Sequence, residues 1–300
     1  MLGVSLPTIT KGLPMTVLLE ALSPSTRPRP LLRWHGGKWM LAPWIIENMP
    51  AHRIYVEPYC GAASVLLRKP RAYSEVINDL DGEVVNLFRV LRDRTDAKEL
   101  QRLLRLTPFA RTEFEESYTA SLDPVEQARR TVVRSFMGFG SNAHNQPTGF
   151  RANSNRSGTT PAHDWANYPD GMDRLTARLQ GVVIEARPAQ AILRQHDAPD
   201  ALHYVDPPYV HETRATGQQT NYRHEMTDDD HRSLAVTLHG LSGMVMLSGY
   251  PSDLYDRELY QDWQRLTRAH HGDGACDRTE CLWFNPAATL RAKQCAMVLL

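Results

Sequence analysis

The tetrapeptide Asp206-Pro207-Pro208-Tyr209 combines residue types suited to chemistry on the amino group of a planar base. The lone pair of such an amine is delocalised into the ring, so the amine becomes nucleophilic only when acceptors hold its two N–H bonds. The Asp206 carboxylate and the Pro207 carbonyl are candidate acceptors, the paired prolines donate no N–H, and Tyr209 could stack on the base. A proline-rich turn after a strand is the alternative interpretation of these four residues.

Two upstream features indicate a nucleotide-like site. Residues 55–64 predict a strand that runs into a small-residue turn and then a helix, a geometry that lets the backbone approach a cofactor closely. Asp79 closes the next predicted strand about 20 residues later, where a carboxylate can accept hydrogen bonds from ribose hydroxyls. Ala62 and Ala63 stand where a dinucleotide-binding turn has glycine, so the turn favours S-adenosylmethionine over a dinucleotide.

Several short segments together make the chain resemble a known family. They are Arg33-Trp34-His35-Gly36-Gly37-Lys38, Glu57-Pro58-Tyr59-Cys60-Gly61, Asn78-Asp79-Leu80-Asp81, the Asp206 tetrapeptide, Leu247-Ser248-Gly249-Tyr250 and Glu280-Cys281-Leu282-Trp283-Phe284-Asn285-Pro286. With them the chain resembles the DNA adenine-N6 methyltransferases of the Dam-like (D12) class, especially forms found in phages and mobile elements. The resemblance covers nearly everything after residue 30.

The resemblance implies methyl transfer from S-adenosylmethionine to N6 of a flipped adenine in double-stranded DNA, without a metal. It implies that Trp34 and Lys38 contact the cofactor and that Asp79 holds its ribose. It further implies that Asp206 meets both the reacting end of the cofactor and the target amine. The remaining cofactor-binding residues expected from the turn are Glu57, Pro58, Tyr59 and Gly61.

After the predicted strand 182–185 the chain departs from this family. Arg187 and Pro188 stand where relatives have an asparagine or aspartate that contacts adenine, so Glu185 or a backbone group would have to replace that contact. The departure leaves open a second hypothesis, a protein that binds DNA and S-adenosylmethionine but has impaired catalysis. A third hypothesis changes the target to RNA adenine, cytosine N4 or a protein amide. The recognition sequence, G-A-T-C or relaxed, and a cognate restriction endonuclease also stay open.

Composition argues against other classes of protein. Of the 300 residues 42% are hydrophobic, enough for a buried core, but no apolar run approaches the length of about 18 residues that a membrane span needs. The first 30 residues lack a basic start followed by an apolar run, which argues against a secretion signal. The four cysteines form no C-x-x-C pair, so we expect reduced thiols and no metal site in a cytoplasmic protein of a bacterium or phage-infected cell.

Seven short apolar runs predict the strands of a Rossmann-like, doubly wound α/β sheet, the fold of class I S-adenosylmethionine-dependent methyltransferases. They lie at 54–57, 74–77, 182–185, 202–205, 243–248, 280–284 and 295–299. Helical patterns at 81–93 and 228–240 lie between them, and Asp81 is a candidate N-cap of the first. The triplet Asp228-Asp229-Asp230 begins the second, where stabilisation of a helix N-terminus is a simpler role than metal binding.

About 100 residues between the second and third predicted strands interrupt this alternation. Helical patterns at 96–106, 111–120 and 123–137 precede the Gly/Asn/Ser-rich stretch 138–160, which is too long for an ordinary connection. We therefore predict a loose extension (1–30), a catalytic domain (31–95 and 180–300) and an inserted, mainly helical DNA-recognition domain (96–179). A monomer would suffice for the chemistry.

The predicted insertion carries charge suited to DNA. The chain has 34 basic and 34 acidic residues, but 127–163 contains no acidic residue, and its arginines and amides could contact phosphates and base edges. A solvated, flexible loop is the alternative. Phe136 and Phe139 are expected to pack rather than intercalate. The predicted DNA-binding residues are Arg129, Arg130, Arg134, Asn142, Asn145 and Arg151.

Overall fold

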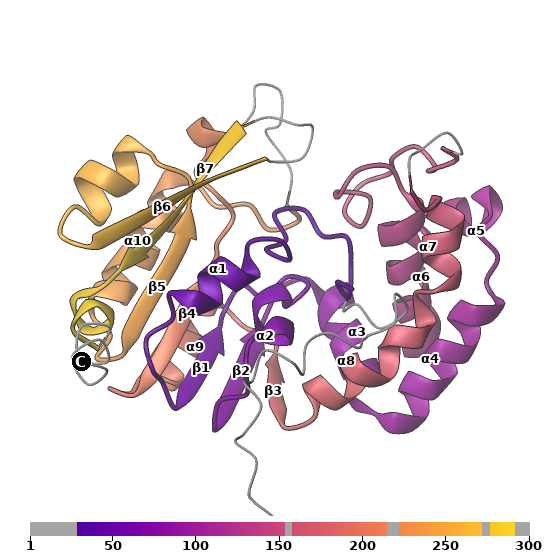
Figure 1. Cartoon of the computed structure of the whole chain (residues 1–300), viewed down its shortest axis with the longest axis horizontal. Helices are drawn as coiled ribbons and strands as arrows, with labels where there is room; N and C mark the ends of the chain where they lie inside the picture. Colours follow the sequence, from indigo (N-terminus) through magenta and orange to yellow (C-terminus); the bar gives the residue numbers. More distant parts are fainter. Residues whose placement is uncertain (1–28, 154–157, 215–221, 272–276, 292–300) are drawn as a thin grey trace, which may run out of the picture.

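A computed structural model describes residues 29–153, 158–214, 222–271 and 277–291, which fold around a seven-stranded sheet (Figure 1). The strand order is β3-β2-β1-β4-β5-β7-β6; the first five strands in this order are parallel, and β7 is antiparallel to both of its neighbours. The strands are β1 (Ile54–Glu57), β2 (Ser74–Asn78), β3 (Val182–Glu185), β4 (Ala201–Val205), β5 (Met244–Gly249), β6 (Gln264–His271) and β7 (Asp277–Phe284).

Helices cover both faces of the sheet, so alternate residues of a strand enter two different cores. In β5, Met244 and Met246 belong to the core that also contains side chains of α1 (Ala42–Glu47), α2 (Ser64–Arg68) and α3 (Gly82–Arg92). Val245 and Leu247 instead pack with α9 (Ala189–Gln195) and α10 (Asp228–His239). This arrangement confirms the predicted doubly wound α/β fold.

Six of the seven predicted strands coincide with strands of the sheet, while the run 295–299 lies outside the described residues. The strand β6 was not predicted. It lies at the edge of the sheet and its residues are mostly exposed and polar, so it lacks the apolar run by which a buried strand is recognised.

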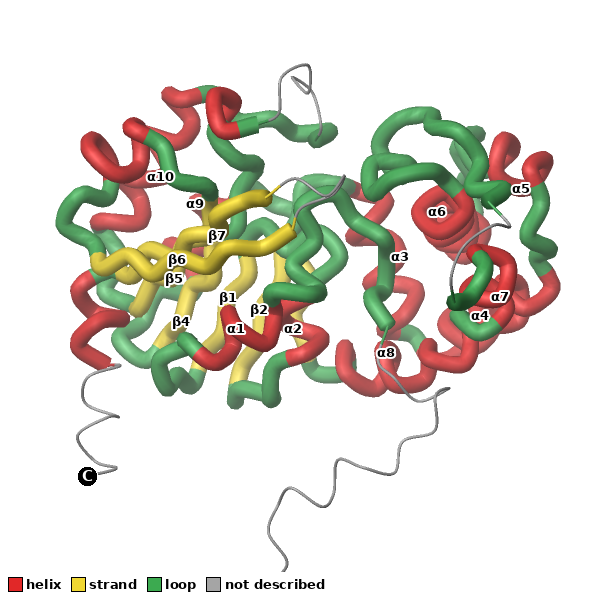
Figure 2. Tube along the Cα trace, turned by 45° about the horizontal axis from the view of Figure 1, so that its top comes forward, coloured by secondary structure: helices red, strands yellow, loops and turns green. Residues whose placement is uncertain are grey.

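Between β2 and β3 the named elements among the described residues are all helices. Figures 1 and 2 show these helices side by side at the β3 end of the sheet. They share one continuous core with α3, in which Phe88 of α3, Phe114 and Val132 are all buried. The elements are α4 (Arg94–Leu106), α5 (Arg111–Glu116), α6 (Pro124–Met137), α7 (Pro161–Ala166), η3 (Pro169–Gly171) and α8 (Met172–Leu179); elsewhere two short turns are η4 (His211–Thr213) and η5 (Leu254–Leu259).

Side-chain caps fix where two of the predicted helices begin. Asp81 accepts a hydrogen bond of 2.9 Å from the Glu83 amide and so caps α3. Thr227 and Asp230 form a capping box at the start of α10, each accepting from the other's amide. The predicted roles of Asp81 and of the acidic triplet at these helix starts are confirmed.

The loop after α6 corrects one expectation about aromatic packing. Phe136 is 7% exposed and packs on Tyr168, with ring centroids 4.4 Å apart, as expected. Phe139 is 73% exposed, so the expectation that it also packs is wrong. The chain turns away from the helices there, since Gly140 adopts a φ of +80° and Gly138 pairs with Phe150 across the loop.

A buried carboxylate ties α8 to the sheet and should be important for stability. Glu75 of β2, 3% exposed, accepts hydrogen bonds from Lys69 (2.9 Å) and from both Arg178 nitrogens (2.6 and 2.9 Å). Glu75→Ala would leave two cations without their partner and should lower the free energy of unfolding in urea by about 3 kcal/mol. Glu99→Ala, which removes an exposed pair with Arg102, is the control; equal losses in the two variants would contradict this role.

Candidate active site

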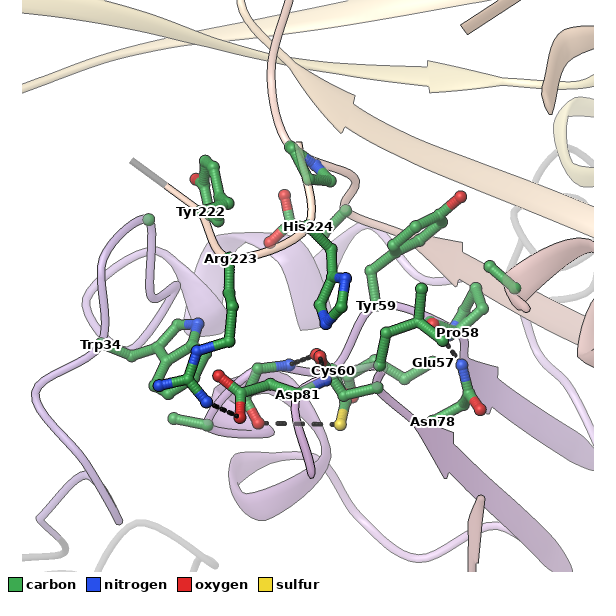
Figure 3. A pocket seen from close by; sticks show the side chains of 18 of the residues that line it. Trp34, Glu57, Pro58, Tyr59, Cys60, Asn78, Asp81, Tyr222, Arg223 and His224 are labelled. Carbon is green, nitrogen blue, oxygen red and sulfur yellow. Dashed lines mark hydrogen bonds and ion pairs between the residues drawn. The ribbon is translucent and has the colours of Figure 1, made fainter. Parts of the chain in front are cut away.

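A cavity of about 280 Å³ opens at the carboxyl ends of the parallel strands, where the strand order reverses between β1 and β4. Ligands of open α/β sheets bind at this position. Its walls come from the loops after β1, β2, β3 and β4, from the loop before α1 and from residues 222–226 (Figure 3). The predicted residues that line it are Trp34, Lys38, Glu57, Pro58, Tyr59, Gly61, Asp79, Asp206 and Pro208. Pro207 and Tyr209 are not among its lining residues.

Asp79 braces the turn after β1. Its two carboxylate oxygens accept hydrogen bonds from the amides of Gly61 (2.8 Å) and Asp81 (2.9 Å). Burial raises the pKa of Asp79, and these two N–H groups act in the opposite direction by stabilising the carboxylate. Each oxygen has a further lone pair, so Asp79 can hold the turn and still accept from ligand hydroxyls.

Trp34 lies between this turn and the loop after α6. Gly61 has a φ of +46°, and a methyl group at this position would collide with the Trp34 indole nitrogen. His144 stacks on the Trp34 ring, with centroids 3.7 Å apart and 20° between the planes. Burial lowers the pKa of His144 to about 3, so this imidazole is neutral. Sequence reasoning missed His144, because nothing in its local pattern places the loop after α6 against a loop a hundred residues earlier.

The side chains of Lys38, Asp206, Tyr209 and Glu280 form a buried cluster beside the cavity. The Lys38 ammonium lies 2.9 Å from Asp206 Oδ1 and 3.9 Å from Glu280 Oε1, and 4.7 Å above the centre of the Tyr209 ring. The Tyr209 hydroxyl donates a hydrogen bond to Glu280. Burial lowers the pKa of Lys38, but Asp206 and Glu280 more than offset this, so the amine stays charged. Burial raises the pKa of Asp206 above its ordinary value and that of Glu280 to about 7.

Residues 222–226 form a further wall that sequence reasoning did not identify. Figure 3 shows Arg223 reaching towards Asp81 beside Trp34. Its guanidinium lies 3.1 Å from Asp81 and 3.3 Å from Glu83. Tyr222 also lines the cavity, close to Gly36. Because Asp81 and Glu83 begin α3, Arg223 connects this wall to the start of that helix.

Arg187 and Pro188, where the sequence departs from the family pattern, follow β3, and Asn78 holds Arg187. The backbone N–H and carbonyl of Arg187 both bond to the Asn78 side chain, at 2.8 and 2.9 Å. The Arg187 guanidinium turns to Gln195, while Pro188, Ala189 and Gln190 line the cavity. The backbone of 188–190 and the Gln190 side chain, whose amide nitrogen donates to Ser233, therefore lie where relatives present an acidic or amide side chain.

Three of the four arginines predicted to bind DNA, Arg129, Arg130 and Arg134, lie on α6 and are engaged in ion pairs. Arg134 is 2.5 Å from Glu83 with a 5% exposed side chain. Arg129 bonds to Glu113 and Glu126, and Arg130 bonds to Glu126. The other three predicted residues, Asn142, Asn145 and Arg151, lie in the loop that follows α6.

Comparison with known proteins places the chain in a family. The profile of the D12 class of N6 adenine-specific DNA methyltransferases matches residues 34–272. The chain is 25% identical to a DNA adenine methylase of Serratia marcescens over 248 residues, 78% of this chain and 86% of that protein. It is also 25% identical to the DNA adenine methylase of Escherichia coli strain K12, over 81% of this chain and 86% of that protein. Type II methyltransferase M.MjaIII of Methanocaldococcus jannaschii is 23% identical over 78% of this chain and 88% of its own length.

The chain therefore belongs to the D12 class of N6 adenine-specific DNA methyltransferases. It is a DNA adenine methyltransferase that uses S-adenosylmethionine, which decides between adenine in DNA and the other planar amines considered above. No helix in the described ranges is both long and apolar enough to cross a membrane. Within those same ranges, no group of three or more His, Cys, Asp or Glu side chains is placed to hold a metal ion.

The cavity has the chemistry that this cofactor requires. S-adenosylmethionine carries a sulfonium cation, ribose hydroxyls and a planar adenine, which call for carboxylates and for flat apolar surfaces. Asp79, Asp81 and Asp206 contribute carboxylates, and Trp34 and Tyr59 contribute aromatic surface. Gly61 leaves the backbone of the turn open where a side chain would collide. The residues present thus fit the group.

The contact between Gly61 and Trp34 should be necessary for cofactor binding. In Gly61→Ala a methyl group meets the indole, and a left-handed conformation costs a residue with a Cβ about 1 kcal/mol. Calorimetry should give an S-adenosylmethionine affinity about tenfold lower than that of the parent protein. Gly82→Ala is the control, because a methyl group there meets nothing within 4 Å. Unchanged affinity in Gly61→Ala would mean that the turn does not contact the cofactor.

Proposed function

We propose that Asp206, Pro207, Pro208 and Tyr209 carry out the methyl transfer at N6 of an adenine flipped out of duplex DNA. The observation that carries this assignment is the position of Asp206, which lies beyond β4 in the same cavity as Asp79 and Trp34. The Asp206 carboxylate and the Pro207 carbonyl would accept the two N–H bonds of the amine and localise its lone pair. S-adenosylmethionine supplies an electrophilic methyl group when it is bound.

Asp206 acts first as a hydrogen-bond acceptor and then receives a proton. The amine becomes acidic as its nitrogen gains the methyl group, so a strong base is not required. Burial raises the pKa of Asp206 and makes the carboxylate a better proton acceptor than an exposed aspartate. Tyr209 would stack on the base, recovering part of the cost of removing it from the helix.

The same cavity supplies the proposed cofactor contacts. Trp34 and Tyr59 would flank the adenosine part, and Asp79 would accept from the ribose hydroxyls. Lys38 would orient Asp206 through their ion pair of 2.9 Å. Backbone groups of 188–190 and the Gln190 side-chain oxygen would read the cofactor's adenine in place of the missing side chain. Glu57, Pro58 and Gly61 complete the wall contributed by the turn after β1.

We further propose that 96–179 is the DNA-recognition domain and that the loop after α6 contacts the duplex. The ion pairs of Arg129, Arg130 and Arg134 with Glu83, Glu113 and Glu126 favour a structural role for these arginines. Phosphate and base contacts would then come from Asn142, Asn145 and Arg151, while the exposed Phe139 could enter the stack as an apolar wedge. A monomer suffices, because the proposed catalytic and cofactor-binding residues all come from one chain.

Catalytic impairment is the competing hypothesis, and the Arg187-Pro188 departure motivates it. The structure gives this hypothesis no added support, because Arg187 points to Gln195 and leaves the cavity accessible. A protein of this kind would bind S-adenosylmethionine and transfer no methyl group.

Loss of the Asp206 carboxylate should abolish turnover. Incubation with labelled S-adenosylmethionine and unmethylated duplex DNA, followed by nucleoside identification, should give N6-methyladenine with the parent protein. Asp206→Ala should lose about 100-fold or more of this activity. Asp229→Ala is the matched control, because that side chain is 92% exposed and does not line the cavity. Near-normal activity in Asp206→Ala would refute the assignment, and cofactor binding without any incorporation by the parent protein would favour impairment.

Truncation of Phe139 tests the DNA-facing loop. If the ring stacks with bases, Phe139→Ala should bind duplex DNA about tenfold more weakly in fluorescence anisotropy. Leu122→Ala removes an even more exposed apolar side chain elsewhere in the helical segment and should bind like the parent protein. Equal affinities of the two variants would place the DNA surface away from this loop.

A further inference from the structure

Glu280 is a buried carboxylate for which the proposed reaction has no direct use. It belongs to β7, is 1% exposed, does not line the cavity and lies 3.9 Å from the Lys38 ammonium. Burying an ion costs several kcal/mol unless partners compensate it, so a second carboxylate beside Asp206 needs an explanation. Both of its polar partners involve the proposed catalytic tetrapeptide: Tyr209 is its last residue, and Lys38 forms an ion pair with its first residue, Asp206.

We propose that Glu280 is a positioning residue for methyl transfer, which holds the Tyr209 hydroxyl and shares the Lys38 charge with Asp206. This inference rests on the proposed roles of Asp206 and Tyr209. Glu280 does not contact the base or the cofactor, and it acts through these neighbours.

The shared ammonium links the charge of Glu280 to the reactivity of Asp206. When Glu280 is ionised, Lys38 interacts with two carboxylates and neutralises Asp206 only in part, so Asp206 remains a good acceptor for the amine. When Glu280 is protonated, Lys38 pairs with Asp206 alone and lowers its proton affinity. The hydrogen bond from Tyr209 adds a second effect, because it fixes the ring that is to stack on the adenine.

The groups around Glu280 set its pKa and hence the pH at which it changes charge. Burial and Asp206 raise its pKa, Lys38 and Tyr209 lower it, and the result is about 7. Turnover should therefore fall as the pH falls through 7 and Glu280 takes up a proton. The other titratable or charged groups packed around it are Tyr204 of β4, Tyr250 after β5, Arg278 and Cys281 of β7, and Arg268, its partner in β6.

Glu280→Gln tests the proposal, because the amide keeps the shape and permanently imitates the protonated state. In single-turnover methylation at pH 8 it should be about tenfold slower than the parent protein. The parent rate should decline between pH 8 and pH 6, whereas the variant should be flat over this range, so that the two rates converge at pH 6. Glu258→Gln, an exposed glutamate paired with Arg232, should retain the parent rate and pH profile.

Tyr209→Phe provides an independent test if Glu280→Gln does not fold by circular dichroism. Loss of the hydroxyl removes a donor that lowers the pKa of Glu280, so the acid limb of the rate profile should move to higher pH. The double variant should lose less than the product of the two single losses, because the residues act together. A parent-like profile in Glu280→Gln, or an unmoved limb in Tyr209→Phe, would overturn the proposal. Retained activity in Asp206→Ala would instead overturn the proposed function itself.

Discussion

The buried ammonium of Lys38 is the interaction on which the rest of the active site depends. It is 5% exposed, and it joins the loop before α1 to Asp206 beyond β4 and to Glu280 in β7. None of these charges could be buried alone at an acceptable cost in free energy. Together they fix the position of the Asp206 carboxylate, and the Tyr209 ring lies beneath the same ammonium. The geometry proposed for methyl transfer would thus be maintained by electrostatics among three segments that are distant in sequence.

A second set of charges joins the cofactor pocket to the helical segment. Asp79 and Asp81 shape the turn that starts α3, and Glu83 in the first turn of α3 accepts both Arg134 of α6 and Arg223. The core also continues from α3 into α6 without a break. The helices proposed to recognise DNA are therefore attached to α3, whose first turn also adjoins the proposed cofactor site. His144 in addition brings the loop after α6 onto Trp34. The predicted domain boundary between residues 95 and 96 therefore does not correspond to a break in the packing, because one core extends across it.

The arginines of α6 illustrate why charge patterns in a sequence are ambiguous. The stretch 127–163 contains no acidic residue, which predicts an exposed basic surface. In the folded chain Glu83 and Glu113 approach from α3 and α5, and Glu126 lies one turn before Arg129 and Arg130 on α6 itself. A stretch of sequence taken by itself does not show that acidic residues from other elements will neutralise its arginines. The exposed ring of Phe139 is the converse case. Phe136 is the same residue type and is buried, and the two environments differ because α6 ends at Met137, between them.

The sequence by itself determined the doubly wound fold, six strands, the starts of α3 and α10 and the family, because these depend on local patterns: apolar runs, capping residues and short motifs. It also predicted Asp79 and Asp206, which the structure brings into one cavity because parallel strands end at a common edge, and Trp34 and Lys38, which reach the same cavity from the loop before α1. Tertiary structure alone decided the polar edge strand β6, the stacking of His144, the wall formed by Arg223 and the place of Glu280. Each of these depends on which distant segments meet, and the burial and charge that result from such contacts have no local signature in the chain.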